Sequence, residues 1–294
     1  MIIDSHTHLF DVFTGHKIKK GIVNYPLGIT MLLEWLGYKK GNNNKTPNKI
    51  IRYLALYDNL KRSKCGTIEN LLFYMSENKI QKSLVWAIEP FVKTKELIEI
   101  YKDNNNLLPI ASINLFNNPD LDIVNEFKKN ISDKVFGLKI HPIIQNIHPA
   151  SEIFLNVLEE YAIYKKPVFL HTGSSSVVFR EYNNYEYGSI YNFEQAVKTF
   201  PNIQFIFGHM GNNTPLEAID LAKKYSNIIL ETSYQNNKII KIAIDNIGIE
   251  RIIFGSDFPY SRQYYALKEI FKLKISCDNL EKILFKNIKK IINI

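Results

Sequence analysis

The sequence predicts an α/β protein, a (β/α)₈ TIM barrel with a lid-like insertion after the first strand. Short apolar runs alternate with longer amphipathic stretches, the runs number eight, and polar residues stand at the ends of several of them. The chain has 294 residues, which suits one barrel, so we expect a single domain over residues 1–294. A hydrophobic content of 46% supplies a large core without a disulfide or structural metal.

The apolar runs are predicted to be parallel strands, because a helix-like stretch separates each strand from the next. The expected strands are residues 1–7, 82–89, 108–115, 135–141, 167–171, 203–209, 228–232 and 251–257. The expected helices are residues 68–78, 93–103, 121–130, 151–164, 192–200, 215–225, 238–247 and 261–271. A final helix at 279–291 would pack on the outside or close the bottom of the barrel.

The first strand ends in two histidines, His6 and His8, at positions i and i+2. Side chains two residues apart leave a strand on the same face, so both can reach one metal ion. Alone, such a pair is a weak signal, because two histidines fall at this spacing by chance.

An insertion over residues 10–66 follows the first strand and is too long for a plain connection. Barrel active sites are built from the loops after the strands, so we expect this segment to cover the site as a lid. Its aromatic residues either contribute to that cover or form the insertion's own core. They include Tyr25, Trp35, Tyr38, Tyr53 and Tyr57.

The fourth strand contains Lys139 and His141 on one face, with Leu138 and Ile140 on the other. The polar pair should point into the barrel, where a lysine is unusual. Pairing with a carboxylate, binding of a substrate anion, or carbamylation to bridge two metals would each explain it. Two loop arginines, Arg180 and Arg262, are further candidates to contact a substrate carboxylate or else are solvated.

Three more polar residues end separate strands: His171 the fifth, His209 the sixth and Asp257 the eighth. Each alone reads as a buried histidine or a helix-capping aspartate. In a closed parallel barrel, however, all strand ends open on one face, which brings these residues to one place together with His6 and His8.

The predicted metal site consists of His6, His8, His171 and Asp257. Imidazole and carboxylate donors favour Zn²⁺, with Mn²⁺, Fe²⁺ or Co²⁺ as substitutes. Such an ion makes hydroxide available at neutral pH. Asp257 would also accept a proton from the bound water, and His209 would stabilise an oxyanion or shuttle a proton.

The motifs DSHTHLF, GLKIHP, LHTG, FGHMG and FGSDFP, in this order, resemble the amidohydrolase superfamily. The resemblance is to the amidohydrolase-related branch that includes aminocarboxymuconate-semialdehyde decarboxylase and related aromatic-acid decarboxylases. It implies a distorted barrel with one divalent metal, usually zinc. It also implies that His209 acts on substrate or water. The residues that resemble the family's metal ligands are His6, His8, His171 and Asp257, while Lys139 falls where other members carry a carbamylated lysine.

Three functions are compatible with these residues. A hydrolase that cleaves an amide, lactone or ester with metal-activated water is the leading prediction. A metal-dependent decarboxylase, a lyase acting on an unsaturated or aromatic acid, is the alternative. A barrel that binds a ligand without catalysis would need no metal.

The net charge of +8 comes largely from lysines spread along the chain, which argues against a groove that binds nucleic acid. We expect a small-molecule substrate, and the positive charge is compatible with an anionic one. No signal-peptide pattern and no long apolar run occur, so we expect a cytoplasmic protein that does not enter a membrane. The outer helices could support a homodimer, although no sequence feature fixes one.

Overall fold

The computed structural model describes residues 1–15, 21–23, 57–116, 121–173 and 184–294. Arg180 lies outside these residues, as does most of the predicted insertion, including Tyr25, Trp35, Tyr38 and Tyr53. The lid role of the insertion therefore stays a prediction.

The strands are parallel and follow one another around the structure in sequence order. One sheet has the strand order β1-β2-β3 and the other β4-β5-β6-β7-β8. Single parallel bridges connect the two sheets, between Ala111 and Leu138 on one side and between Thr7 and Phe258 on the other. This arrangement confirms the predicted fold class. The strands are β1 (Ile3–Thr7), β2 (Lys82–Trp86), β3 (Leu107–Ile110), β4 (Leu138–Ile140), β5 (Val168–His171), β6 (Phe205–Gly208), β7 (Ile228–Glu231) and β8 (Ile252–Ile253).

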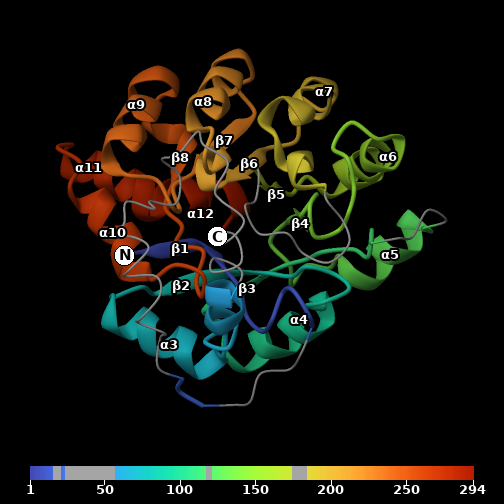
Figure 1. The fold of residues 1–294 in the computed structure, drawn as a ribbon, viewed down its shortest axis with the longest axis horizontal. Helices are drawn as coiled ribbons and strands as arrows, with labels where there is room; N and C mark the ends of the chain where they lie inside the picture. The colour runs from blue at the N-terminus through green and yellow to red at the C-terminus, as the bar shows by residue number, and fades with distance from the viewer. Residues whose placement is uncertain (16–20, 24–56, 117–120, 174–183) are drawn as a thin grey trace.

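The helices lie outside the strands, as Figure 1 shows. Several begin at a side chain that caps the first turn, as Thr67 and Ser151 do by accepting from the amides of Asn70 and Phe154. The crossover helices are α3 (Ile68–Glu77), α4 (Thr94–Asp103), α5 (Ile123–Asn130), α6 (Glu152–Tyr161), α7 (Glu194–Thr199), α8 (Pro215–Lys224), α9 (Asn237–Ile247) and α10 (Gln263–Phe271).

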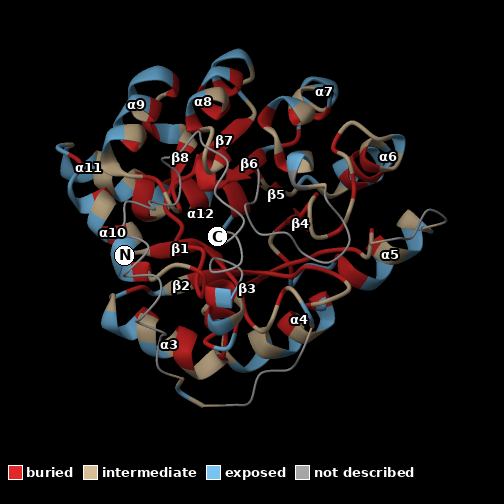
Figure 2. Ribbon diagram, viewed as in Figure 1, coloured by how far each residue is buried: buried red, intermediate tan, exposed pale blue. Residues whose placement is uncertain are grey.

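The core has two parts, and burial is concentrated around the strands (Figure 2). A large cluster fills the space between strands and helices, and a smaller one contains inward-facing residues such as Ile3, Trp86 and Phe169. Ile288 and Ile291 belong to the smaller cluster. The C-terminal segment therefore closes the barrel interior, and it consists of α11 (Cys277–Glu281), a π turn at Lys282–Lys286 and α12 (Asn287–Ile292) instead of the single predicted helix.

Each predicted strand extends past the observed one at one end or both. In two of them, 203–209 and 251–257, the predicted last residue lies on a turn: His209 directly follows β6, Asp257 lies four residues after β8, and both have a φ of 62°. This left-handed conformation is uncommon for residues other than glycine and turns the backbone sharply. The polar groups thus sit on turns at the mouth of the barrel.

The described ends of the insertion contact each other and the loop after β8. The Phe10 amide donates to the Gly66 carbonyl (2.7 Å). The Phe13 ring lies 5.2 Å from the Tyr260 ring between centroids, and Arg62 Nη1 donates to the Tyr260 carbonyl (2.6 Å). Since Tyr260 follows Asp257 by three residues, both ends of the insertion start from the face that carries the polar residues.

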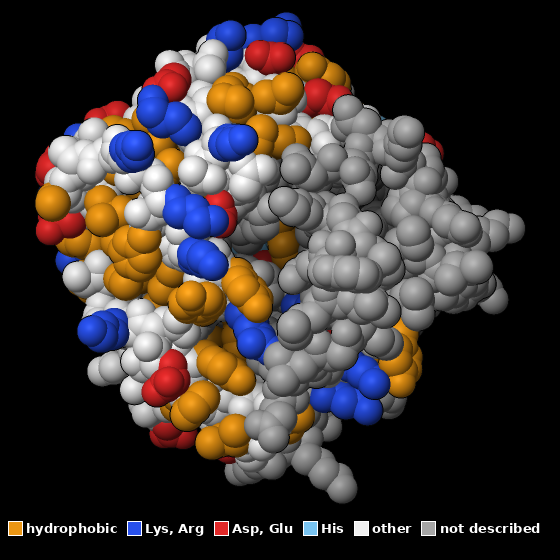
Figure 3. All heavy atoms as spheres, turned by 60° about the vertical axis from the view of Figure 1, so that its left-hand side comes forward, with side chains coloured by type: hydrophobic (Ala, Val, Ile, Leu, Met, Phe, Trp, Pro, Cys, Tyr) orange, Lys and Arg blue, Asp and Glu red, His pale blue; other side chains and the backbone are white. Residues whose placement is uncertain are grey.

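Lysine and arginine side chains are scattered among acidic and apolar ones on the face drawn in Figure 3. Within the described residues, the structure contains no helix with both the length and the apolar character that crossing a bilayer requires. The absence of a nucleic-acid partner and the cytoplasmic location stay predictions.

Candidate metal centre

Three of the four predicted ligands meet at the barrel mouth. His6 Nε2 lies 3.2 Å from His8 Nε2, and Asp257 Oδ1 lies 3.3 Å from each of these nitrogens. All three residues are buried. Ligand atoms at about 2.0–2.2 Å from a shared ion stand roughly 3 to 3.5 Å apart, so the spacing of this triad fits one metal ion.

The seam between β1 and β8 positions the triad. The Asp257 amide donates to the His6 carbonyl (2.8 Å), and the His8 amide donates to the Phe258 carbonyl (2.6 Å). Alternation along β1 places the two histidines on one side, and the left-handed turn at Asp257 brings its carboxylate to the same point.

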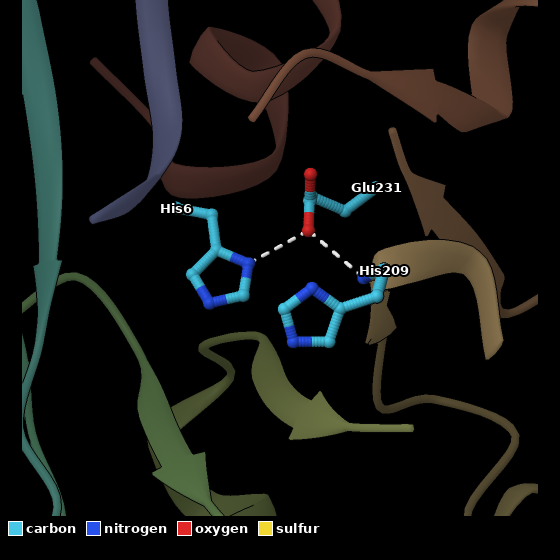
Figure 4. A group of neighbouring side chains, drawn as sticks. All are labelled: His6, His209 and Glu231. Carbon is cyan, nitrogen blue, oxygen red and sulfur yellow. Dashed lines mark hydrogen bonds and ion pairs between the residues drawn. The ribbon is translucent and has the colours of Figure 1, made fainter. Parts of the chain in front are cut away.

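Glu231, at the end of β7, is a site residue that the sequence analysis missed. Its Oε2 accepts from His6 Nδ1 (2.7 Å) and from the His209 amide (2.9 Å), as Figure 4 shows. Burial raises the pKa of Glu231 to about 7, although the hydrogen bonds from His209 and Ser233 act in the opposite direction. An acid closing a strand of otherwise apolar residues was the signal available in the sequence.

A chain of hydrogen bonds leads from Glu231 to His171. The Ser233 hydroxyl donates to Glu231 Oε2 (2.7 Å), so its oxygen accepts from His209 Nδ1 (2.7 Å). His209 Nε2 then carries no proton and accepts from His171 Nδ1 (3.1 Å). This order leaves a lone pair on His171 Nε2, a buried atom without a hydrogen-bond partner among the residues that the structure describes.

The same reasoning applies to the two first-strand histidines. His6 Nδ1 donates to the Glu231 carboxylate, and His8 Nδ1 donates to the Trp86 carbonyl (3.3 Å). His6 Nε2 therefore holds a lone pair. Burial keeps the pKa of His6 and of His171 well below the usual value, so both rings are neutral. Among the described residues, His171 does not join His6, His8 and Asp257 in a group whose ligand atoms all lie within 4.8 Å of one another. Two imidazoles and a carboxylate, as in the triad, suit a divalent metal.

Comparison with known families places this chain. The family model described as "Amidohydrolase" matches residues 3–294. The chain belongs to the amidohydrolase family. A comparison with curated protein sequences gives no match.

Solved structures similar to this amidohydrolase share its fold at low sequence identity. An uncharacterised TIM-barrel protein from Bordetella bronchiseptica has a TM-score of 0.68 and 16% identity, and covers 99% of this chain and 98% of its own. The 5-carboxyvanillate decarboxylase LigW from Sphingomonas paucimobilis has a TM-score of 0.68 and 13% identity, and the alignment covers 100% of this chain and 99% of LigW. A dihydroxybenzoic acid decarboxylase from Polaromonas sp. JS666, with bound manganese and the inhibitor 2-nitroresorcinol, has a TM-score of 0.66 and 15% identity. The alignment covers 99% of this chain and 96% of that enzyme.

Tyr234 is a second residue at the candidate site that the sequence analysis missed. Its hydroxyl donates a short hydrogen bond to Asp257 Oδ2, the oxygen that does not face the histidines. Burial raises the pKa of Asp257, but the electrostatic interactions with His6 and His8 and the hydrogen bond from Tyr234 outweigh it, so the net shift is downward. Tyr234 has a φ of 63°, close to the 62° of His209 and Asp257, and such backbone strain concentrates at functional sites.

The remaining predicted residues are placed as follows. Lys139 points into the barrel and is buried, as predicted. The His141 ring stacks on His171 with 4.0 Å between ring centroids, and its Nδ1 accepts from the Ile144 amide. Arg262 precedes α10 and lies 5.9 Å from the ring centroid of Tyr265, outside the triad, so its contact with substrate stays a prediction.

Proposed function

We propose that this amidohydrolase is a metal-dependent, non-oxidative decarboxylase of a small aromatic or unsaturated carboxylic acid. The sequence alone favoured hydrolysis of an amide, lactone or ester. The decarboxylases among the similar structures favour the alternative. The observation that carries the proposal is the buried triad of His6 Nε2, His8 Nε2 and Asp257 Oδ1 at the mouth of a barrel of this kind.

The residues that would hold the metal are His6, His8, His171 and Asp257. We assign either zinc, which the donor chemistry favours, or manganese, which the Polaromonas enzyme binds. When bound, the ion supplies a positive charge that orients and polarises oxygen atoms of the substrate.

Decarboxylation breaks the bond between the carboxyl carbon and the ring. The electron pair stays on the ring carbon, a proton takes the place of the carboxyl group, and CO₂ leaves. We assign proton delivery to the Tyr234 hydroxyl, which is hydrogen-bonded to Asp257 Oδ2 beside the triad, and a proton from water then restores the hydroxyl.

The hydrogen bonds of His209 favour a positioning role for this residue. Its Nδ1 donates to Ser233 and its Nε2 accepts from His171, so neither nitrogen is available to take a proton from water. We therefore assign His209 to holding His171 in place, instead of the proton shuttle predicted from the sequence.

The test is to load the purified protein with Zn²⁺ or Mn²⁺ and to offer 5-carboxyvanillate and dihydroxybenzoic acids beside ester and lactone substrates. We expect one CO₂ released for each acid consumed, and loss of that activity on chelation. Turnover of an ester or lactone without CO₂ release from any acid would contradict the proposal and restore the hydrolase.

A further inference from the structure

Lys139 in β4 is a buried lysine whose Nζ has no hydrogen-bond acceptor in the described part of the chain. Its side chain is 1% exposed, and Nζ has no hydrogen-bond partner among the described residues. It is the only lysine buried in the part of the chain that the structure describes. Such a group is costly to bury alone, so its placement needs a compensating partner.

Trp86 connects Lys139 to the metal site. Lys139 Nζ lies 4.0 Å from the Trp86 ring centroid, and that tryptophan ring stacks on His6 with 3.4 Å between centroids. The aromatic contact stabilises an ammonium group by less than the cost of burying that group alone. The ring therefore locates the lysine beside the triad but does not compensate for its charge.

The nearby carboxylates have other partners. Burial lowers the pKa of Lys139 well below its usual value, and the charges of Asp257 and Glu231 act in the opposite direction. Neither carboxylate forms a hydrogen bond with Nζ. Asp257 faces His6, His8 and Tyr234. Glu231 accepts from His6 Nδ1, from the His209 amide and from the Ser233 hydroxyl. Among the described residues no carboxylate is left to accept from Nζ, and a bound anion can supply that acceptor.

We infer that Lys139 Nζ binds the carboxylate of the substrate, which selects monoanionic aromatic acids over neutral analogues. The inference rests on the proposed function in one respect, the aromatic ring of the substrate. Loss of CO₂ removes the negative charge from the lysine–carboxylate pair. A neutral product is then held less tightly than the acid, which favours its release.

The experiment measures binding of benzoate and of neutral benzamide to the metal-loaded protein by calorimetry. The variant is Lys139→Met, which keeps the length and apolar stem of the side chain. The matched control is Lys166→Met, because Lys166 precedes β5 at the opposite end of the barrel and donates to the carbonyls of Ser132 and Val135. Metal content is determined for each protein.

We expect Lys139→Met to weaken benzoate binding at least tenfold, to change benzamide binding less than twofold, and to leave the metal content unchanged. Lys166→Met should bind both ligands as the wild type does. Unchanged benzoate affinity in Lys139→Met would overturn the inference. Loss of metal from this variant alone would also overturn it, because the lysine would then be a metal ligand, for example as a carbamate.

Two further measurements keep the outcome decisive. Lys139→Gln, which is neutral but polar, replaces the methionine variant if that protein does not fold. The CO₂ assay separates this inference from the proposed function. Benzoate binding that needs Lys139 without CO₂ release from any acid refutes only the decarboxylase, whereas CO₂ release with benzoate binding independent of Lys139 refutes only the role of the lysine.

Discussion

Replacement of Glu231 by glutamine should weaken both the fold and the metal site. The carboxylate accepts from His6 Nδ1, the His209 amide and Ser233 Oγ at Oε2, and from the Ser233 amide at Oε1. An amide group has one acceptor oxygen and one donor nitrogen. Whichever way the glutamine is turned, at least one buried donor faces another donor.

The magnitude follows from the less damaging orientation, in which the glutamine oxygen takes the Oε2 position. One buried hydrogen bond is lost and the others no longer have a charged acceptor, which costs about 2–3 kcal/mol of unfolding free energy. His6 is also held less firmly, and loss of such a supporting acceptor lowers metal affinity about 10- to 100-fold.

Urea unfolding and competition with a chelator measure the two effects. Glu250→Gln is the matched control, because Glu250 is an exposed residue whose contact with Lys282 contributes little. If Glu231→Gln unfolds and binds metal as the wild type and the control do, then Glu231 does not orient His6 and the chain of hydrogen bonds drawn from it is wrong.

Three other perturbations test the site and its surroundings. A Cβ at Gly255 would lie 2.4 Å from Glu231 Oε1, so we expect Gly255→Ala to lower the unfolding free energy by about 1–3 kcal/mol and to weaken metal binding; a variant with normal metal affinity would contradict this. Burial raises the pKa of Glu89 to about 7, above its ordinary value of 4.5. Because the folded state keeps this proton longer, stability should fall by up to about 3 kcal/mol as the pH rises from 4.5 through 7. The glutamine oxygen of Glu89→Gln can still accept from the Thr94 amide. This variant should therefore have a higher Tm than the wild type at pH 8 and the same Tm at pH 4.5, and equal Tm values at both pH values would refute the assignment. Zn²⁺ or Mn²⁺ at about 100 times its Kd should raise the Tm of the metal-free protein by about 4 °C, and a shift that persists in His6→Ala would place the ion elsewhere.

The sequence by itself determined the fold class, the strand order and which three side chains meet in the candidate metal centre. Alternation along a strand is a local property of the backbone, so the spacing of His6 and His8 placed both on one face. The rule that parallel strands end together then brought Asp257 to them across the length of the chain. Lys139 was expected inside the barrel for the same reason.

Only the tertiary structure decided the partners of these residues. Glu231 is 225 positions from the histidine that it holds, and their contact requires a closed ring of strands and a sharp turn at His209. The hydrogen bond between Tyr234 and Asp257 likewise depends on two left-handed turns that no periodicity encodes. Local patterns fix which way a side chain points, whereas closure of the barrel fixes what it meets.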